Sequence, residues 1–469
     1  MRTFIGNGVT LILLGVMTIF PDMTLAQPAA TPMTEQAVRQ DADLRSETND
    51  LAAPADIRAS QSQEPDEMIQ QMIDDFLGRN NLVEGRNPNK KNKHIYTSIQ
   101  VIDKPVTHPD FAKFRITAYD RAYEKALDSF VRAQGVRTAT RISSSFLSDN
   151  SSDAKTFEQE LSSGRSSITA LVEKAIALGD AKLNALLQEL GVDPSQYDAS
   201  APDQKKILLR RTFTKHIMDE VSKSLGGVTV AQTFFAEAES GYAAVGVVLC
   251  YSPSIEGIAE AFRSGQKPAI AQTGRPLHEI LPLDDPAKLY DMLGTRLLLD
   301  ESGPVVVAFG QWANSYQGSS KSLLAEYRNA AYTQADSNAN SELSSFLNQS
   351  FTAKTETEQG DLLEEAVIRS GETGMTAETE SGAIRDVIRS AAQRTTSAYL
   401  TGAVKLKQWK YVTPQGHEVV GVVKAYSFAS MEEAKKTFKK EIPEPQKEAP
   451  VELNPSAREG SVTMDFDTF

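Results

Sequence analysis

Cysteine and histidine are scarce in this chain of 469 residues, which contains one cysteine, Cys250, and five histidines. A single thiol excludes an intramolecular disulfide framework and any zinc site made of cysteines alone. The histidines include no HExxH motif; they are His94, His108, His216, His278 and His417. His216 and Glu220 stand four residues apart on an expected helix. This spacing suits a shared metal ion or, as we favour, an ordinary pair on a solvated helix face.

Motifs of common catalytic sites are also missing, since the sequence has no G-x-S-x-G, no P-loop and no G-x-G-x-x-G. Ser148-Asp149-Asn150 and Ser152-Asp153-Ala154-Lys155 imitate two penicillin-binding motifs, but their order is reversed and no KTG triplet exists. We therefore predict no catalytic residue, no metal ligand and no cofactor. The sequence does not indicate which residues bind a partner or ligand.

Positive charge is in deficit, because 49 Lys and Arg residues face 62 Asp and Glu residues, for a formal net charge of −13. General nucleic-acid binders carry the opposite excess, so nucleic acid is not an expected partner. Apolar residues make up 40% of the chain and charged residues 24%. That balance is slightly polar for a chain that is folded throughout.

Long hydrophobic runs are limited to Val9–Phe20, a stretch of 12 residues that follows Arg2. About 20 apolar residues are needed to span a membrane, so we favour a removable signal peptide over an uncleaved anchor. The small residues of Thr24-Leu25-Ala26 predict cleavage near Ala26. We expect a periplasmic or secreted bacterial protein with no transmembrane segment in the mature chain, and no cysteine is placed for lipidation.

Both ends of the remaining chain are poor in large apolar residues. We expect residues 27–65 to be a disordered linker and residues 441–469 a disordered, proline-bearing tail. A short amphipathic helix and a basic loop are expected in residues 66–90 and just beyond. The loop Arg86–Lys93 suits a solvated connector, with contact to anionic lipid or polysaccharide as the alternative.

An internal repeat is the strongest signal in the sequence. At an offset of 175, residues 225–252 match residues 400–427 without a gap, with nine identities over 28 positions that include Gly227/Gly402 and Gly241/Gly416. The matched segments have the pattern of a β-hairpin. Upstream, the strands Tyr96–Ile102 and Pro304–Trp312 each precede a long helix, expected at about residues 110–134 and 319–346.

The repeat predicts an α+β fold of two related modules, each a small antiparallel sheet covered by a long helix, with helical insertions. The first module spans residues 91–265 and contains a helical hairpin at about residues 157–225, formed by Ser167–Leu190 and Pro202–Leu225. Residues 266–294 are expected to be a connector, and residues 295–440 the second module. Thr295–Asp300 adds a further expected strand to that module. Cys250 is expected to be a small buried apolar residue of a central strand.

Alanines at helical spacing mark the two long helices; they are Ala118, Ala122 and Ala126, followed by Leu127, in the first module and Ala331 and Ala335 in the second. This arrangement of strand, Ala-rich helix and hairpin resembles small bacterial outer-membrane lipoproteins and the N-terminal domain of flagellar T-ring assembly proteins. The resemblance implies an envelope scaffold or binding module rather than a reaction. The chain departs from these families by lacking a lipidation cysteine and by its helical insertions.

Two functional hypotheses follow. The first is a non-enzymatic cell-envelope scaffold or binding protein with protein partners. The second is an envelope enzyme, a hydrolase, whose active site lies between the modules. As a separate hypothesis, the helical hairpin Ser167–Leu225 either mediates self-association or packs only within its own chain.

Overall fold

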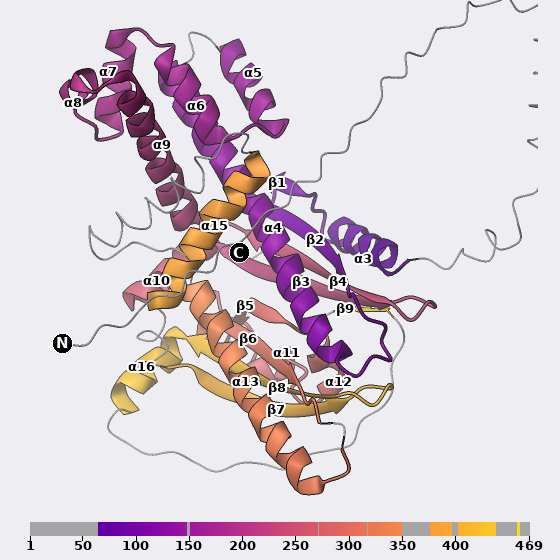
Figure 1. Cartoon of the computed structure of the whole chain (residues 1–469). Helices are drawn as coiled ribbons and strands as arrows, with labels where there is room; N and C mark the ends of the chain where they lie inside the picture. Colours follow the sequence, from indigo (N-terminus) through magenta and orange to yellow (C-terminus); the bar gives the residue numbers. More distant parts are fainter. Residues whose placement is uncertain are drawn as a thin grey trace, which may run out of the picture. The chain divides into compact units, whose positions relative to one another are not determined.

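The computed structural model describes residues 64–147, 151–270, 272–316, 318–348, 376–395, 402–437 and 457–459 (Figure 1). The expected signal peptide, nearly all of the expected linker and most of the expected tail lie outside these residues. No helix in the described ranges is long and apolar enough to cross a membrane.

The first module is built on an antiparallel sheet with the strand order β1-β2-β4-β3-β9. Its strands are β1 (Gly85–Asn87), β2 (Lys93–Val101), β3 (Val228–Glu237), β4 (Ala243–Tyr251) and β9 (Ala457–Glu459). The long helix α4 (Phe111–Ile142) covers one face, and α3 (Pro65–Arg79) contacts the same strands through a separate hydrophobic cluster. β4 is buried along its whole length, as its continuous apolar sequence predicts.

The second module repeats this plan with the strand order β5-β6-β8-β7. Its strands are β5 (Gly294–Asp300), β6 (Gly303–Ala313), β7 (Val404–Val412) and β8 (Glu418–Ser427). The long helix α13 (Lys321–Asn348) packs on β6 and β8. The opposite face packs against residues around the short helices α11 (Leu277–Ile280) and α12 (Pro286–Tyr290). The structure confirms an α+β fold with two related sheet modules.

The two hairpins correspond in backbone detail as well as in sequence. A β-bulge lies between Val230 and Gln232 in the first and between Lys405 and Lys407 in the second, again at an offset of 175. The turn glycines Gly241 and Gly416 have φ of 76° and 88°, a left-handed conformation that other residues adopt at a cost. The repeat therefore preserves residues that the turn itself requires.

Both modules begin earlier in the chain than the sequence suggested. Helix α3 precedes the first sheet and covers the face opposite α4, while α11 and α12 precede the second sheet and cover the face opposite α13. Residues 277–290 are thus part of the second module rather than a plain connector. Each amphipathic segment buries its apolar side chains on the sheet that follows it.

Helices differ most from the expected boundaries. α4 continues past Gln134 to Ile142 and into a π-helical turn, Ser143–Leu147, because its last turns pack on α6 and α9. The expected single helix Ser167–Leu190 is wrong: it breaks near Gly179, a residue that stabilises helix poorly. Residues 151–225, here called the helical insertion, form α5 (Ser151–Ser162), α6 (Ser167–Ile176), α7 (Asp180–Glu189), α8 (Pro194–Ala199) and α9 (Pro202–Leu225).

The modules share a hydrophobic core. One buried cluster contains residues of α3, of both sheets, of α13 and of α10 (Pro253–Ser264), including Ile69, Phe234, Phe262, Leu343 and Tyr426. The rings of Phe262 and Tyr426, one from each module, meet edge to face with their centroids 5.7 Å apart. A shared core fixes the two sheets relative to one another.

A glycine in each central strand allows a close approach. A Cβ on Gly246 would collide with Ile69 of α3, and a Cβ on Gly421, its counterpart in the repeat, would collide with the ring of Trp409. We expect Gly246→Ala to lower the free energy of unfolding by about 2 kcal/mol, because α3 must shift to make room. Urea unfolding followed by circular dichroism measures this change.

Gly257→Ala is the matched control. Gly257 is exposed on α10, and a Cβ there has open space around it. This substitution should stabilise the protein by up to about 1 kcal/mol, since alanine favours helix. Equal effects of the two substitutions would contradict the packing assigned to α3.

Candidate functional site

The junction of the two modules contains a buried arginine, Arg115 of α4, which is 2% exposed. Its Nη1 donates a hydrogen bond to Oε1 of Gln311 at 3.1 Å, and its Nη2 donates to the backbone oxygen of Tyr290. The guanidinium carbon also lies 3.8 Å from the centre of the Tyr290 ring. Arg115 thereby joins the first module to α12 and β6 of the second.

Gln311 completes this contact from the other side. Its amide nitrogen donates to the backbone oxygens of Leu289, Tyr290 and Met292 at 3.0, 3.1 and 2.6 Å. The side chain of Gln311 therefore orients the loop whose carbonyl groups receive the arginine.

A second arginine, Arg296 of β5, is fully buried at the same junction. It donates to the backbone oxygens of Leu293 and Thr295 at 2.9 and 3.1 Å, and to Oγ1 of Thr233 on β3 at 3.0 Å. Burial lowers the pKa of Arg296 to about 10. The hydroxyl of Thr233 in turn donates to the backbone oxygen of Asp291 at 3.0 Å, so β3 is bound to the second module through a polar chain.

His417 also joins the modules. Its ring is buried, and its Nε2 lies 2.8 Å from the backbone oxygen of Val106 in the first module. The junction is therefore closed to solvent, and its polar side chains connect the two modules; they are Arg115, Arg296, Gln311 and His417. This does not favour the hypothesis of an active site between the modules.

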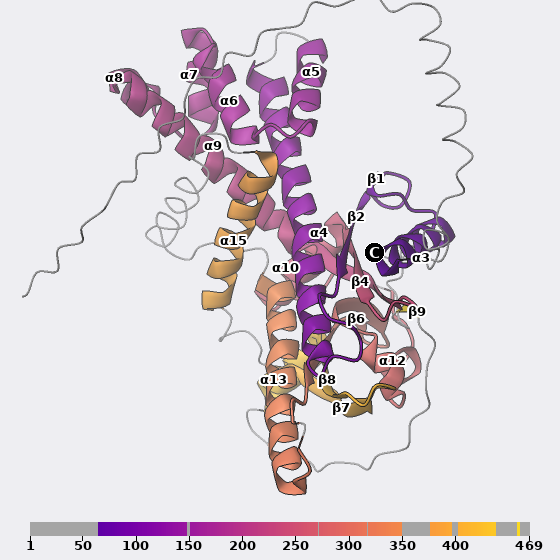
Figure 2. The same ribbon diagram turned by 45° about the vertical axis from the view of Figure 1, so that its right-hand side comes forward.

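The helical insertion is held by a segment of the second module, α15 (Ala377–Thr395), which lies beside α4 in both ribbon views (Figures 1 and 2). Glu380 of α15 is 4% exposed and points at the start of α6. Its carboxylate accepts hydrogen bonds from the backbone N–H groups of Ser167 and Ile168 at 3.2 and 3.3 Å and from the hydroxyl of Ser166. A carboxylate at this position satisfies N–H groups that have no partner within the helix.

Burial dominates the protonation of Glu380. It raises the pKa of this carboxyl from 4.5 to about 7, against the lowering effect of its hydrogen bonds and of Arg210. The contact between α15 and α6 thus includes a group that changes charge near neutral pH.

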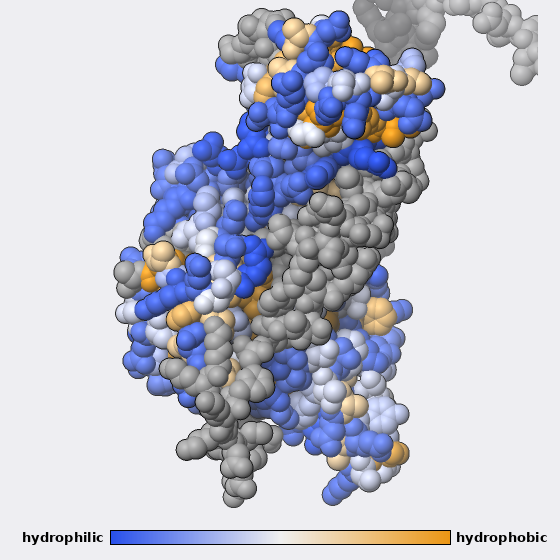
Figure 3. All heavy atoms as spheres, turned by 90° about the vertical axis from the view of Figure 1, so that its left-hand side faces the viewer, coloured by the Kyte–Doolittle hydropathy of each residue, from blue (hydrophilic) through white to orange (hydrophobic). Residues whose placement is uncertain are grey.

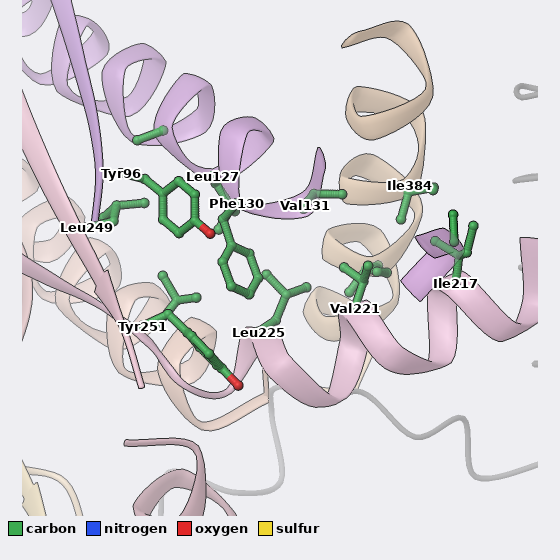
Figure 4. Packing of buried hydrophobic residues seen from close by; sticks show 14 of the residues in the cluster. Tyr96, Leu127, Phe130, Val131, Ile217, Val221, Leu225, Leu249, Tyr251 and Ile384 are labelled. Carbon is green, nitrogen blue, oxygen red and sulfur yellow. The ribbon is translucent and has the colours of Figure 1, made fainter. Parts of the chain in front are cut away.

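A second polar contact and an apolar one complete the attachment of α15. Arg385 donates to Oδ2 of Asp128 on α4 at 2.6 Å. Ile384 and Ile388 enter the core in which α4, α9 and β4 meet, and Figure 4 shows Ile384 facing Val221 and Ile217 of α9. The second module therefore stabilises the insertion of the first.

A cluster of titratable side chains lies where β2, β4 and α10 meet. The His94 ring lies 5.6 Å from the Tyr251 ring, and the Tyr251 hydroxyl donates to Oε2 of Glu256 at 2.9 Å. Burial, with Arg137 and Arg86 nearby, lowers the pKa of His94, while burial raises that of Glu256 and raises that of Tyr251 to about 12. No sequence motif marks this cluster, because only strand pairing brings His94 opposite Tyr251.

The other histidines considered from the sequence are found either in ordinary hydrogen-bonded contacts or at the surface. Arg141 donates to Oε2 of Glu220 at 3.0 Å and lies 3.5 Å from Nε2 of His216. The arginine side chain therefore already contacts the two residues that were considered as ligands of a shared metal ion. His108 accepts from the backbone of Asp110, and His278 is exposed. No group of three or more metal-ligating side chains occurs in the described ranges.

Cys250 is buried in β4, where burial raises the pKa of its thiol to about 12, in keeping with its expected role as a small apolar residue. Ser148-Asp149-Asn150 lies outside the described residues, and Ser152–Lys155 belongs to α5.

Apolar side chains reach the surface of the helical insertion, as the hydropathy view of the molecule shows (Figure 3). Ile176 at the end of α6 is 51% exposed, and Ile207 of α9 is 49% exposed. Isolated exposed residues of this kind are common, but interaction surfaces are built from them.

Comparisons with known proteins identify a domain but no activity. Residues 168–264 match the model of a domain of unknown function, DUF6844, which covers helices α6 to α10 and the β3-β4 hairpin. Among solved structures, the chain is similar to a hypothetical protein from Francisella tularensis, with 18% identity, a TM-score of 0.48, and coverage of 78% of this chain and 92% of that one. No curated protein matches the sequence.

Loss of Arg115 should weaken the junction. Arg115→Met keeps the apolar stem of the side chain but removes the charged donor from two buried acceptors, the Gln311 side chain and the Tyr290 carbonyl. We therefore expect the free energy of unfolding to fall by about 3 kcal/mol. Arg121→Met on the same helix removes an exposed ion pair with Asp103 and should change the free energy of unfolding by less than about 0.5 kcal/mol. Similar losses in both variants, measured by urea unfolding, would argue against the junction as a source of stability.

Glu380 should make stability depend on pH. Between about pH 4.5 and 7 the folded protein keeps a proton that the unfolded chain has released, so the free energy of unfolding falls as the pH rises through this window. The full effect is on the order of 3 kcal/mol. Glu380→Gln cannot ionise and should flatten this part of the profile.

Glu378→Gln provides the control, because Glu378 is exposed on the same helix. Thermal unfolding from pH 4.5 to 8 compares the three proteins. A Glu380→Gln profile as steep as the parent's would show that this carboxyl does not titrate in the folded protein.

Proposed function

We propose that this protein is a periplasmic or cell-envelope scaffold or binding protein without catalytic activity. The observation that carries the proposal is the use of charged groups away from the surface: the buried Arg115, Arg296 and Glu380 and the partly buried Arg385 each connect one module to the other. Such contacts stabilise a particular arrangement of two sheets and an attached helical insertion. A fixed arrangement of surfaces is what a scaffold supplies to its partners.

The helical insertion is the proposed binding element for envelope proteins. It exposes Ile176 and Ile207, and it is attached to the rest of the chain by α15. The segment matched by the DUF6844 model also includes four of its helices, α6 to α9. Self-association through this insertion is the alternative within the same proposal.

Location in the envelope is supported by the sequence alone. The proposal rests on the apolar run Val9–Phe20 and the small residues that end at Ala26. The resemblance to outer-membrane lipoprotein modules and to flagellar T-ring assembly proteins points to the same compartment. We therefore place the expected partners in the cell envelope.

One cluster favours a second candidate function, an envelope hydrolase. His94, with its lowered pKa, would be neutral and able to accept a proton near neutral pH. Its ring contacts that of Tyr251, whose hydroxyl is hydrogen-bonded to Glu256, a carboxyl with a raised pKa. The Tyr251 hydroxyl already donates to Glu256, which equally suits a structural cluster.

Site-specific photocrosslinking tests the proposal. A photoreactive residue placed at Ile207 of the full chain, expressed in the native envelope, should give adducts with another protein. The same residue placed at Leu323, which is 43% exposed on α13, should give fewer adducts and serves as the control. An adduct with a second copy would identify the insertion as a self-association surface.

Absence of adducts at both Ile207 and Ile176 would count against the insertion as a binding element. The enzyme hypothesis is tested separately with the purified protein and a panel of hydrolase substrates. Turnover that is lost in His94→Gln but kept in His278→Gln would replace the scaffold proposal with an enzymatic one.

A further inference from the structure

The edge of the first sheet binds an extended segment from a distant part of the chain. β9 pairs antiparallel with the outer side of β3, with Glu459 opposite Phe234, Arg458 opposite Phe235 and Ala457 opposite Ala236. This pairing turns a four-stranded sheet into a five-stranded one. The edge of this hairpin can therefore accept an added strand.

β7 is the equivalent edge of the second sheet. It corresponds to β3 in the repeat, shares its bulge position and pairs with β8 as β3 pairs with β4. Among the described residues, β7 ends its sheet, and Val404 and Val412 at its two ends are 46% and 45% exposed. Along its outer side, backbone N–H and C=O groups face away from β8, which is the basis of strand addition.

The charge of β7 indicates which kind of strand fits. Its sequence carries Lys405, Lys407 and Lys410 and no acidic residue. Lys405 shares Asp336 with Lys424, Lys407 pairs with Asp284, and Glu418 interacts with both Arg328 and Lys410. Three carboxylates thus meet five cationic side chains, and positive charge is left in excess beside this edge.

A second copy of the chain fits this edge poorly. Antiparallel pairing of two β7 strands would bring lysines of like charge together, and lysines on edge strands oppose this kind of association. An acidic strand would instead place carboxylates opposite the lysines. Complementary charge therefore favours a partner over self-pairing.

We propose that the outer edge of β7 is a strand-addition site for an extended acidic segment of a partner protein. This inference rests on the proposed binding function and adds to it a second surface, separate from the helical insertion. Backbone hydrogen bonds would supply the part of the affinity that does not depend on the partner's sequence, and the lysines would favour acidic sequences.

The test uses the full chain and a blocked, fluorescein-labelled peptide of nine residues in which glutamate alternates with valine and threonine. Fluorescence anisotropy should show binding, and hydrogen exchange should slow at amides of β7 when the peptide is bound. A peptide with lysine in place of glutamate should bind at least about tenfold more weakly. A peptide with three consecutive central prolines should also lose binding, since proline has no N–H to donate.

Charge reversal in the protein supplies the matched control. Lys405→Glu together with Lys410→Glu should weaken binding of the acidic peptide by about tenfold or more. Lys91→Glu together with Lys267→Glu changes the net charge equally at exposed positions outside both β7 and the helical insertion, and should leave binding within about twofold. Circular dichroism verifies that both double variants are folded.

Three results would overturn the inference. They are an acidic peptide that does not bind, a proline peptide that binds as well as the parent peptide, and binding that leaves exchange at β7 unchanged. Binding that appears only after removal of residues 438–469 would also overturn it, because the chain's own segment would then be the occupant. Adducts at Ile207 alongside any of these results would leave the proposed binding function intact and reject the edge alone.

Discussion

Arg115 imposes a constraint on which the arrangement of the two modules depends. A guanidinium removed from water needs acceptors around it, and here they are supplied by Gln311 and the Tyr290 carbonyl of the other module. Gln311 then binds three carbonyl groups of the loop before β5. If the modules separated, the guanidinium would lose its acceptors and the carbonyl groups would lose their donors. The buried arginine therefore stabilises one arrangement of the two sheets.

The duplicated plan explains how one chain supplies both halves of such contacts. Each sheet is covered by a long helix on one face and by a preceding short helical segment on the other. The copies then diverged in the segment between long helix and hairpin. The first carries the helical insertion, and the second provides α15, whose Glu380 binds the start of α6 in that insertion and whose Arg385 binds Asp128 of α4. The segments in which the two copies differ therefore contact one another.

Much of the architecture was predictable because each hairpin of the repeat is formed by residues close to one another in sequence. Gly241 and Gly416 require a left-handed backbone, and the apolar run of β4 requires a covered strand, so the hairpins follow from residues within about 30 positions of each other. The helix boundaries were not predictable to the same degree. The last turns of α4 depend on contacts with α6 and α9, and the break near Gly179 separates two stretches with the same apolar pattern.

The amino-acid pattern alone predicts the fold class, the duplication and the strands of both hairpins, and it contains no familiar catalytic motif, since each of these is recorded in short stretches of sequence. Which side chains meet depends instead on how the chain folds. His94 lies opposite Tyr251, Glu380 binds the start of α6 and Arg115 binds Gln311, over separations of 157, 213 and 196 residues. The physical reason is that such pairs are created by strand pairing and by burial between modules, and no periodicity along the chain records either.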